Sequence, residues 1–307
     1  MSTARKLDQF YTSRTVAANC LNFLDELVPS SHCNAAHFLE PSAGDGAFLE
    51  LLPPERRTGV DVDPKHPEIV TQDFLLEFFP RLDVEQWIVV GNPPFGKNSS
   101  KAVRFFNKSA EFADVIAFVV PRTFRKASLQ RRLHASFELL GDLELSDDAF
   151  LFEGKPYSVP CSFQVWRRTT AIRDCIALPL TDDDFIFCSK AQADFAVRRI
   201  GALAGKVIRY FDNYSPNSHF FIRAAIDPEI LMTRIEQLCW KDTKWNTAGN
   251  PSISKRELVQ KYSSTYAERG APPTQRAISQ ASIAQPGRTE QRALHASIAM
   301  QHHLIET

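Results

Sequence analysis

Residues 38–48 read FLEPSAGDGAF, and this stretch decides the fold class. A short apolar strand ends at Glu40, a turn of small residues with two glycines follows, and an apolar helix then begins. Glycine at a strand-to-helix turn lets a ligand approach the backbone closely. The third glycine of the dinucleotide fingerprint is missing, because Leu49 stands in its place, and no P-loop lysine follows. Glu40 and Asp45 disfavour a phosphate here and favour a cationic or neutral ligand.

Two further strand ends carry acidic residues in the same order along the chain. Residues 58–64 (TGVDVDP) form a short strand with Asp61 at about the distance from the glycine turn where a Rossmann-like fold places a ribose-binding carboxylate. Residues 71–75 (TQDFL) end a third strand with Asp73 and Phe74, a pair that can bond an adenine amino group and pack on its ring. Each acid alone is typical of a solvated turn. Their order after the glycine turn favours a ligand with ribose and adenine.

Residues 87–95 read WIVVGNPPF, a buried strand that runs into a rigid loop. Asn92 offers a carboxamide oxygen as acceptor, and the two prolines stiffen the loop and lack N–H donors. Phe95 adds a flat ring. The motif predicts a slot for a planar amino group such as the exocyclic amine of a nucleobase. Alone it would equally fit a proline-rich turn, and the upstream segments make the functional interpretation preferable.

Together these segments resemble the class I S-adenosylmethionine-dependent methyltransferases of the N6-adenine type. Residues 8–12 (DQFYT) look like the family's FYT element, and residues 92–95 look like its catalytic NPPY/F motif. The motif order is similar to the γ arrangement of DNA adenine methyltransferases, and the match covers roughly residues 8–168. The resemblance implies S-adenosyl-L-methionine as cofactor, bound by Phe10, Tyr11, Thr12, Glu40, Pro41, Ser42, Ala43, Gly44, Asp45, Gly46, Asp61, Asp73, Phe74 and Asn92.

The same resemblance implies a mechanism of direct methyl transfer to adenine N6. The catalytic residues would be Asn92, Pro93, Pro94 and Phe95, with the Asn92 side chain and the Pro93 carbonyl accepting the two amine hydrogens. A base in duplex DNA would be flipped out and stacked between Phe95 and a second aromatic residue. We expect that residue to be Phe152, with Phe150 and Tyr157 as alternatives. No metal or covalent intermediate is required, so catalysis would rest on orientation and electrostatics.

The strand pattern predicts an α/β fold: a Rossmann-like, doubly wound, mostly parallel sheet with a small α/β C-terminal appendix. Further strands are expected near residues 114–120, 137–140 and 159–167. We expect a catalytic domain over residues 1–169, an accessory or target-recognition region over 170–264, and a mobile tail over 265–307. In the second region we expect strands at 184–189, 207–211 and 219–223, and helices at 191–203 and from 228 to about 240.

Composition indicates the setting and the partner. The six cysteines are scattered without CxxC pairs, and no apolar run approaches a membrane span. We therefore expect no metal, no membrane and a reduced intracellular location, cytoplasmic in a prokaryote or nuclear in a eukaryote. Net charge is zero, but residues 97–132 hold nine basic against two acidic side chains. This excess favours nucleic acid as partner, through Lys97, Lys101, Arg104, Arg122, Arg125 and Lys126.

Several alternatives remain open from the sequence. DNA is the preferred substrate, and a cognate restriction endonuclease is then an expected partner if the chain belongs to a restriction–modification system. The same chemistry on structured RNA is the next interpretation, and glutamine methylation in protein is the third. An inactive relative that binds nucleic acid is the non-enzymatic alternative, although no matched motif position carries a disabling residue. In the C-terminal region, five basic residues are either phosphate contacts or ordinary surface charge: Arg198, Arg199, Lys206, Arg209 and Arg223.

Overall fold

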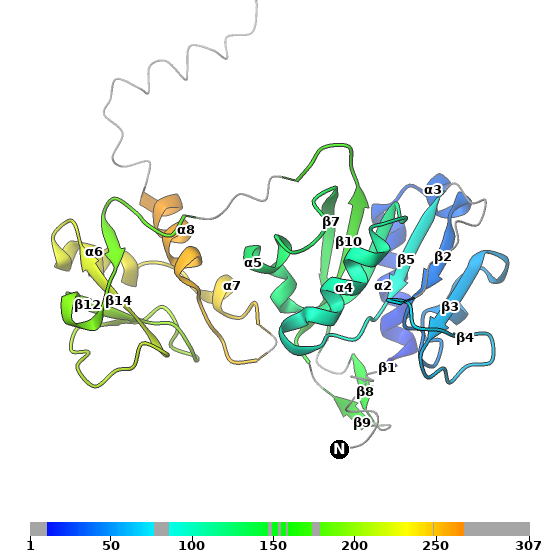
Figure 1. Cartoon of the computed structure of the whole chain (residues 1–307), viewed down its shortest axis with the longest axis horizontal. Coiled ribbons are helices and arrows are strands. Elements are labelled where there is room, and N and C mark those ends of the chain that lie inside the picture. Colours follow the sequence, from blue (N-terminus) through cyan, green and yellow to red (C-terminus); the bar gives the residue numbers. More distant parts are fainter. Residues whose placement is uncertain are drawn as a thin grey trace, which may run out of the picture. The chain divides into compact units, whose positions relative to one another are not determined.

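The computed structural model describes residues 11–76, 86–146, 149–152, 155–157, 159–173, 179–247 and 249–266. Its central element is a seven-stranded sheet with the order β4-β3-β2-β5-β6-β10-β7 (Figure 1). The strands are β2 (His37–Glu40), β3 (Arg57–Asp61), β4 (Val70–Thr71), β5 (Trp87–Gly91), β6 (Val115–Pro121), β7 (Phe137–Glu144) and β10 (Cys161–Arg168). Strands β2 to β6 pair in parallel, and β10 is antiparallel to both β6 and β7. The predicted Rossmann-like, mostly parallel fold is confirmed.

The sheet is buried on both faces because its central strands are apolar throughout. In β6 every residue is buried, and alternate side chains enter different cores. Val115, Ala117 and Val119 belong to one core, and Ile116, Phe118 and Val120 belong to the other. Such continuous apolar runs are typical of parallel strands covered by helices on both sides.

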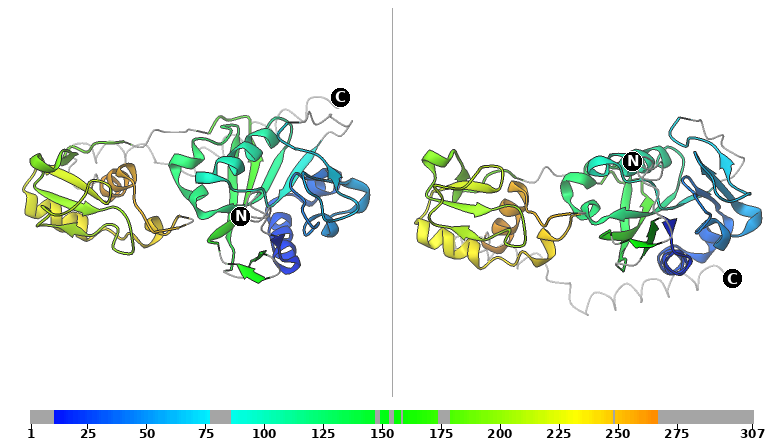
Figure 2. Two further views of the ribbon diagram at one scale, coloured as in Figure 1. Left: turned by 60° about the horizontal axis from the view of Figure 1, so that its bottom comes forward. Right: turned by 90° about the horizontal axis from the view of Figure 1, so that it is seen from below.

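The helices are α2 (Arg14–Leu27), α3 (Ser30–Ala35), α4 (Ser100–Ser109), α5 (Ala127–Gln130), α6 (Pro228–Glu236), α7 (Lys241–Lys244) and α8 (Lys255–Tyr266). Helices α2 and α4 lie on opposite faces of the large sheet (Figure 2). Helix α2 begins where Ser13 accepts a hydrogen bond from the Val16 N–H, an ordinary N-cap. None of the described helices is long and apolar enough to cross a membrane.

The helix expected after the glycine turn is wrong. The segment forms only a 3₁₀ helix, Leu49–Leu51. Pro53 and Pro54 follow after Leu52, and proline disfavours helical backbone in the residue before it and cannot donate a helical N–H. The chain therefore leaves the turn in a short 3₁₀ segment and reaches β3 through a second one, Pro54–Arg56.

A small second sheet joins two segments that lie far apart in the sequence. Its order is β1 (Tyr11–Thr12), β8 (Phe150–Phe152) and β9 (Lys155–Tyr157). Tyr11 pairs with Leu151 and Thr12 with Phe150, both antiparallel. The segment that resembles the FYT element is thus hydrogen-bonded, through β1, to β8, which carries the aromatic residue expected to stack on the target base. No local sequence pattern indicated this pairing.

The C-terminal region forms an antiparallel four-stranded sheet with the order β11-β14-β12-β13. The strands are β11 (Phe185–Phe187), β12 (Phe195–Arg198), β13 (Val207–Ile208) and β14 (His219–Ala224). The expected helix at 191–203 is wrong, because β12 occupies its centre. Phe195 and Val197 are both buried, and their two-residue spacing fits a strand better than a helix. The expected strands at 184–189, 207–211 and 219–223 are present within one or a few residues.

The chain divides into a compact unit, Met1–Gln260, and a second unit that begins at Lys261. Of the expected tail at 265–307, the described residues are 265 and 266, which end α8, and the rest lies outside the described part. The expected boundaries near residues 169 and 264 stay predictions.

Candidate active site

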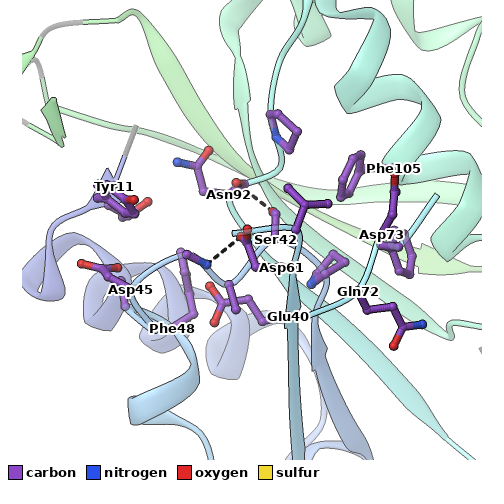
Figure 3. A pocket seen from close by; sticks show the side chains of 18 residues that line it. Tyr11, Glu40, Ser42, Asp45, Phe48, Asp61, Gln72, Asp73, Asn92 and Phe105 are labelled. Atoms are coloured by element: carbon purple, nitrogen blue, oxygen red, sulfur yellow. Dashed lines mark hydrogen bonds between the residues drawn. The ribbon is translucent and has the colours of Figure 1, made fainter. Parts of the chain in front are cut away.

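A cavity of about 720 Å³, partly open to solvent, lies at the carboxyl ends of the parallel strands (Figure 3). Ligands of open α/β sheets bind at this edge. All the expected cofactor residues line it except Gly46 and Phe10, and Phe10 lies outside the described residues. Its further lining residues are Ala47, Phe48, Val62, Gln72, Pro94 and Phe105.

Asp61 organises the glycine turn. Its carboxylate accepts hydrogen bonds from the Gly44 N–H at 2.9 Å and from the Asp63 N–H at 2.8 Å. A carboxylate offers about four lone-pair sites, so two remain for hydroxyl donors of a ligand. The residue therefore fixes the turn and still offers the acceptors that a ribose requires.

Gly44 brings the backbone close to Tyr11. Its φ is +52°, and a Cβ built on it would lie 3.0 Å from the Tyr11 Cε1 atom. Glycine adopts this left-handed conformation without the penalty that other residues carry. The glycine turn can therefore pack directly against the Tyr11 ring in the wall of the cavity.

We expect Gly44→Ala to lower cofactor affinity, because the added methyl group strains the turn and displaces Tyr11. The strain should also reduce the free energy of unfolding by about 1 kcal/mol. Calorimetric titration and thermal unfolding measure the two effects. Gly249→Ala is the matched control, since a Cβ there meets nothing within 4 Å. Equal cofactor affinity in both variants would contradict the role given to the turn.

Glu40 is a buried acid in the wall of the cavity, 2 % exposed. Its carboxylate accepts a hydrogen bond from the Leu49 N–H at 2.8 Å. Burial raises its pKa well above the usual value, and the nearby acids Asp45 and Asp61 act in the same direction. A cationic ligand in the cavity would offset this cost of charging the carboxyl.

The raised pKa makes stability depend on pH. A carboxyl group with a folded-state pKa above its unfolded value loses stabilisation as pH rises from the unfolded value, about 4.3, through the folded one. We therefore expect the melting temperature of the cofactor-free protein to fall more steeply with rising pH than that of Glu40→Gln. Thermal unfolding between about pH 5 and 8 tests this, with the exposed Glu68→Gln as control. Parallel curves for wild type and Glu40→Gln would refute it.

The two ends of the cavity differ in chemistry. At one end Tyr11 and Asp45 lie together, whereas Asp73 and Phe105 lie at the other end (Figure 3). Burial raises the pKa of Asp45, and the nearby Arg14 acts in the opposite direction. At the second end Phe74 and Phe105 pack with ring centroids 5.4 Å apart. One end therefore suits an amino-acid group, and the other suits a flat ring.

Phe105 lines the cavity but was not among the expected site residues. It lies on α4, the helix that follows the proline-rich loop, on the face that also buries Ala102 and Phe106. The three- and four-residue spacing of these side chains is typical of a buried helix face, but it does not tell which of them reaches the cavity. That depends on how α4 packs against the sheet.

The loop at residues 92–95 is held at both of its ends. The Ser42 hydroxyl donates to the Asn92 carbonyl at 3.1 Å, and the Lys101 and Ala102 N–H groups donate to the Phe95 carbonyl at 3.1 and 3.3 Å. Asn92 and Pro94 line the cavity, whereas Pro93 is buried and Phe95 packs against both cores. Asn92 lies on the same side of the cavity as Tyr11 (Figure 3).

One further observation shows that the residues of the cavity fit a ligand of the S-adenosylmethionine type. Thr12 is 5 % exposed and lines the cavity, and its hydroxyl oxygen has no hydrogen-bond partner among the described residues. A buried hydroxyl without a partner is costly, and a polar ligand group would supply one. Within the described part of the chain, no group of three or more His, Cys, Asp or Glu side chains is placed to hold a metal ion.

The expected stacking residues are only partly described. Phe152 ends β8, but its side chain lies outside the described part, as does that of Tyr157. Phe150 is completely buried in a hydrophobic core. Phe152 therefore stays the predicted second aromatic.

The expected nucleic-acid residues fall into two groups. Lys97 and Arg104 are exposed, and Lys101 is half-buried near the start of α4. The other three form ion pairs within the chain: Arg122 with Glu144 at 2.6 Å, Arg125 with Asp142 and Glu144, and Lys126 with Glu257 at 2.8 Å. Phosphate contact by all six stays a prediction.

Comparison with known proteins gives likeness in fold only. No family model matches the chain, and no curated protein matches it. Solved structures with a similar arrangement include a candidate RNA methyltransferase from Pyrococcus horikoshii (19 % identity, TM-score 0.41, 53 % of this chain and 88 % of that one). Others are a magnesium protoporphyrin IX methyltransferase from Synechocystis with bound SAM (12 %, 0.37, 50 % and 79 %) and the DrdV–DNA complex (14 %, 0.39, 54 % and 27 %). The function proposed below therefore rests on the geometry of the site.

Proposed function

We propose that this protein transfers a methyl group from S-adenosylmethionine to the N6 amine of adenine in nucleic acid, with DNA as the preferred substrate. One observation carries the proposal. A single cavity joins the acids of β2 and β3, the aromatic pair Phe74 and Phe105, and Asn92 of the NPPF loop. Cofactor groups and an amine acceptor thus meet in one cavity.

The cofactor would be held along the length of the cavity. Asp73, Phe74 and Phe105 would contact its adenine, Asp61 its ribose hydroxyls, and Tyr11, Thr12 and Asp45 its amino-acid end. Bound there, it supplies a methyl group activated by a positively charged sulfonium. The acids of the wall favour that charge, whereas a phosphate would be repelled.

The residues of the loop would prepare the nucleophile. An adenine amine is a weak nucleophile because its lone pair is delocalised into the ring. The Asn92 side-chain oxygen and the Pro93 carbonyl would accept its two hydrogens and draw electron density to nitrogen. Because Ser42 and the start of α4 already hold both ends of the loop, the acceptors need little reorganisation during the reaction.

Methyl-labelled S-adenosylmethionine incubated with separate pools of duplex DNA, single-stranded DNA and total RNA tests this proposal. We expect label in the duplex DNA pool. Label only in RNA would transfer the same chemistry to an RNA substrate. Label in no nucleic acid, despite measured cofactor binding, would overturn the proposal, and a protein pool would then test glutamine methylation.

A further inference from the structure

The C-terminal region contains a second hollow, separate from the cavity described above. One wall is the turn between β12 and β13, and the other runs from the end of α6 through α7 to Trp245. It measures about 1080 Å³ including the part open to solvent. The two cavities share no lining residue. Its chemistry can therefore be considered by itself.

Two tryptophans give the hollow its aromatic surface. Trp245 is 47 % exposed, which leaves a large ring face available, whereas Trp240 is 8 % exposed. The Trp240 ring packs directly on the backbone of Gly205, where an added Cβ would lie only 2.1 Å from its Cδ1 atom. The Trp240 indole N–H has no acceptor among the described residues. One ring thus forms a fixed wall, and the other is free to stack.

The charge around these rings is positive. Lys206, Lys241 and Lys244 line the hollow together with a single acid, Glu236. Lys244 bridges the two walls, since its ammonium donates to the Ala202 carbonyl at 2.7 Å. Lys206 and Lys241 are exposed, and neither forms an ion pair with a described residue. Two lysines are therefore available to an anionic ligand.

We propose that this hollow binds an unpaired nucleotide of a nucleic-acid strand. The base would stack on Trp245, and the flanking phosphates would pair with Lys206 and Lys241. Aromatic platforms combined with lysines are the usual means of holding single strands, because every base has a π-face and every phosphate a charge. The lysines disfavour a cationic ligand, and a purely apolar ligand would provide no anionic group to pair with them. This inference goes beyond methyl transfer, because it requires neither cofactor nor reaction.

Fluorescence anisotropy of a labelled oligothymidylate of about 12 nucleotides, a length within single-strand site sizes, tests the proposal. The full chain is used without cofactor. We expect Trp245→Ala, and separately Lys206→Glu with Lys241→Glu, to weaken binding at least about fivefold, in line with the usual loss on removing a stacking ring. Trp245→Phe should retain most of the affinity. Tyr210→Ala, an aromatic residue 91 % exposed and outside the hollow, is the matched control.

Three results would overturn the proposal. These are wild-type affinity in both hollow variants, an equal loss in Tyr210→Ala, and binding of free thymidine monophosphate as tight as that of the oligonucleotide. Thermal unfolding shows which variants remain folded. Oligothymidylate carries no adenine amine and the measurement contains no cofactor, so failure of methyl transfer and failure of this site are distinguishable.

Discussion

Replacing Asn92 with alanine is expected to lower methyl transfer at least about a hundredfold, in line with losses seen when one preorganised hydrogen-bonding group is removed from an active site. Cofactor affinity should change only a few-fold. Asn92 follows the last residue of β5, and its carbonyl is fixed by the Ser42 hydroxyl at 3.1 Å. The variant therefore removes the side-chain acceptor and leaves the loop anchored at both ends.

Two variants control the Asn92 experiment. Asn92→Asp keeps acceptor oxygens at the same position and should retain far more activity than Asn92→Ala. Asn34→Ala removes an exposed side chain and keeps the main-chain carbonyl through which this residue accepts a hydrogen bond from Arg56. It should behave like wild type. Loss of cofactor binding in Asn92→Ala, with transfer intact at saturating cofactor, would contradict the role of Asn92 as acceptor of the substrate amine.

The second large effect is expected at Asp61. Here cofactor affinity should fall, whereas methyl transfer at saturating cofactor should be largely kept. Asp61→Ala should weaken cofactor binding by at least about tenfold, since hydrogen bonds to charged groups contribute about 1.5–3 kcal/mol. The loss has two sources: the acceptors for the ribose hydroxyls and the bond from the Gly44 N–H that shapes the turn. Transfer should recover in large part at high cofactor concentration.

Calorimetric titration with S-adenosylmethionine measures this effect. Asp63→Ala is the matched control, because it removes a carboxylate two residues away that bonds the Lys65 ammonium at 2.6 Å. We expect that control to stay within a few-fold of wild type. Normal cofactor affinity in Asp61→Ala would mean that the end of β3 does not hold the ribose.

The parallel sheet and most of the residues that line the cavity could be predicted from sequence because their signals are local. Strand β6 is a continuous apolar run, Glu40 and Asp61 are the last residues of β2 and β3, and Asp73 follows the end of β4. Strand ends of a parallel sheet meet at one edge, so residues there come together whatever the loops do. This rule placed Glu40, Asp61, Asp73 and Asn92 in one site.

Features that depend on tertiary contact could not be predicted in this way. The pairing of Thr12 with Phe150 joins strands that lie far apart in the sequence. The ion pair of Lys126 with Glu257 likewise neutralises a charge that the sequence suggested for phosphate. Around β12, the spacing of apolar residues suggested an amphipathic helix, whereas pairing with β13 and β14 decides for a strand.

The pairing of β1 with β8 links the cofactor end of the site to the segment that carries Phe152. If Phe152 stacks on the target base, cofactor and nucleic acid should change each other's affinity by the same factor, as reciprocity of coupled sites requires.

The central claim is that Asn92 presents the N6 amine of adenine to a methyl donor. Its most direct test is digestion of labelled nucleic acid to nucleosides, followed by mass spectrometry, with wild type and Asn92→Ala compared at saturating cofactor. We predict label in N6-methyldeoxyadenosine with wild type and its loss with the variant. Label on a cytosine or on a ribose, or equal N6 label from both proteins, would contradict the account.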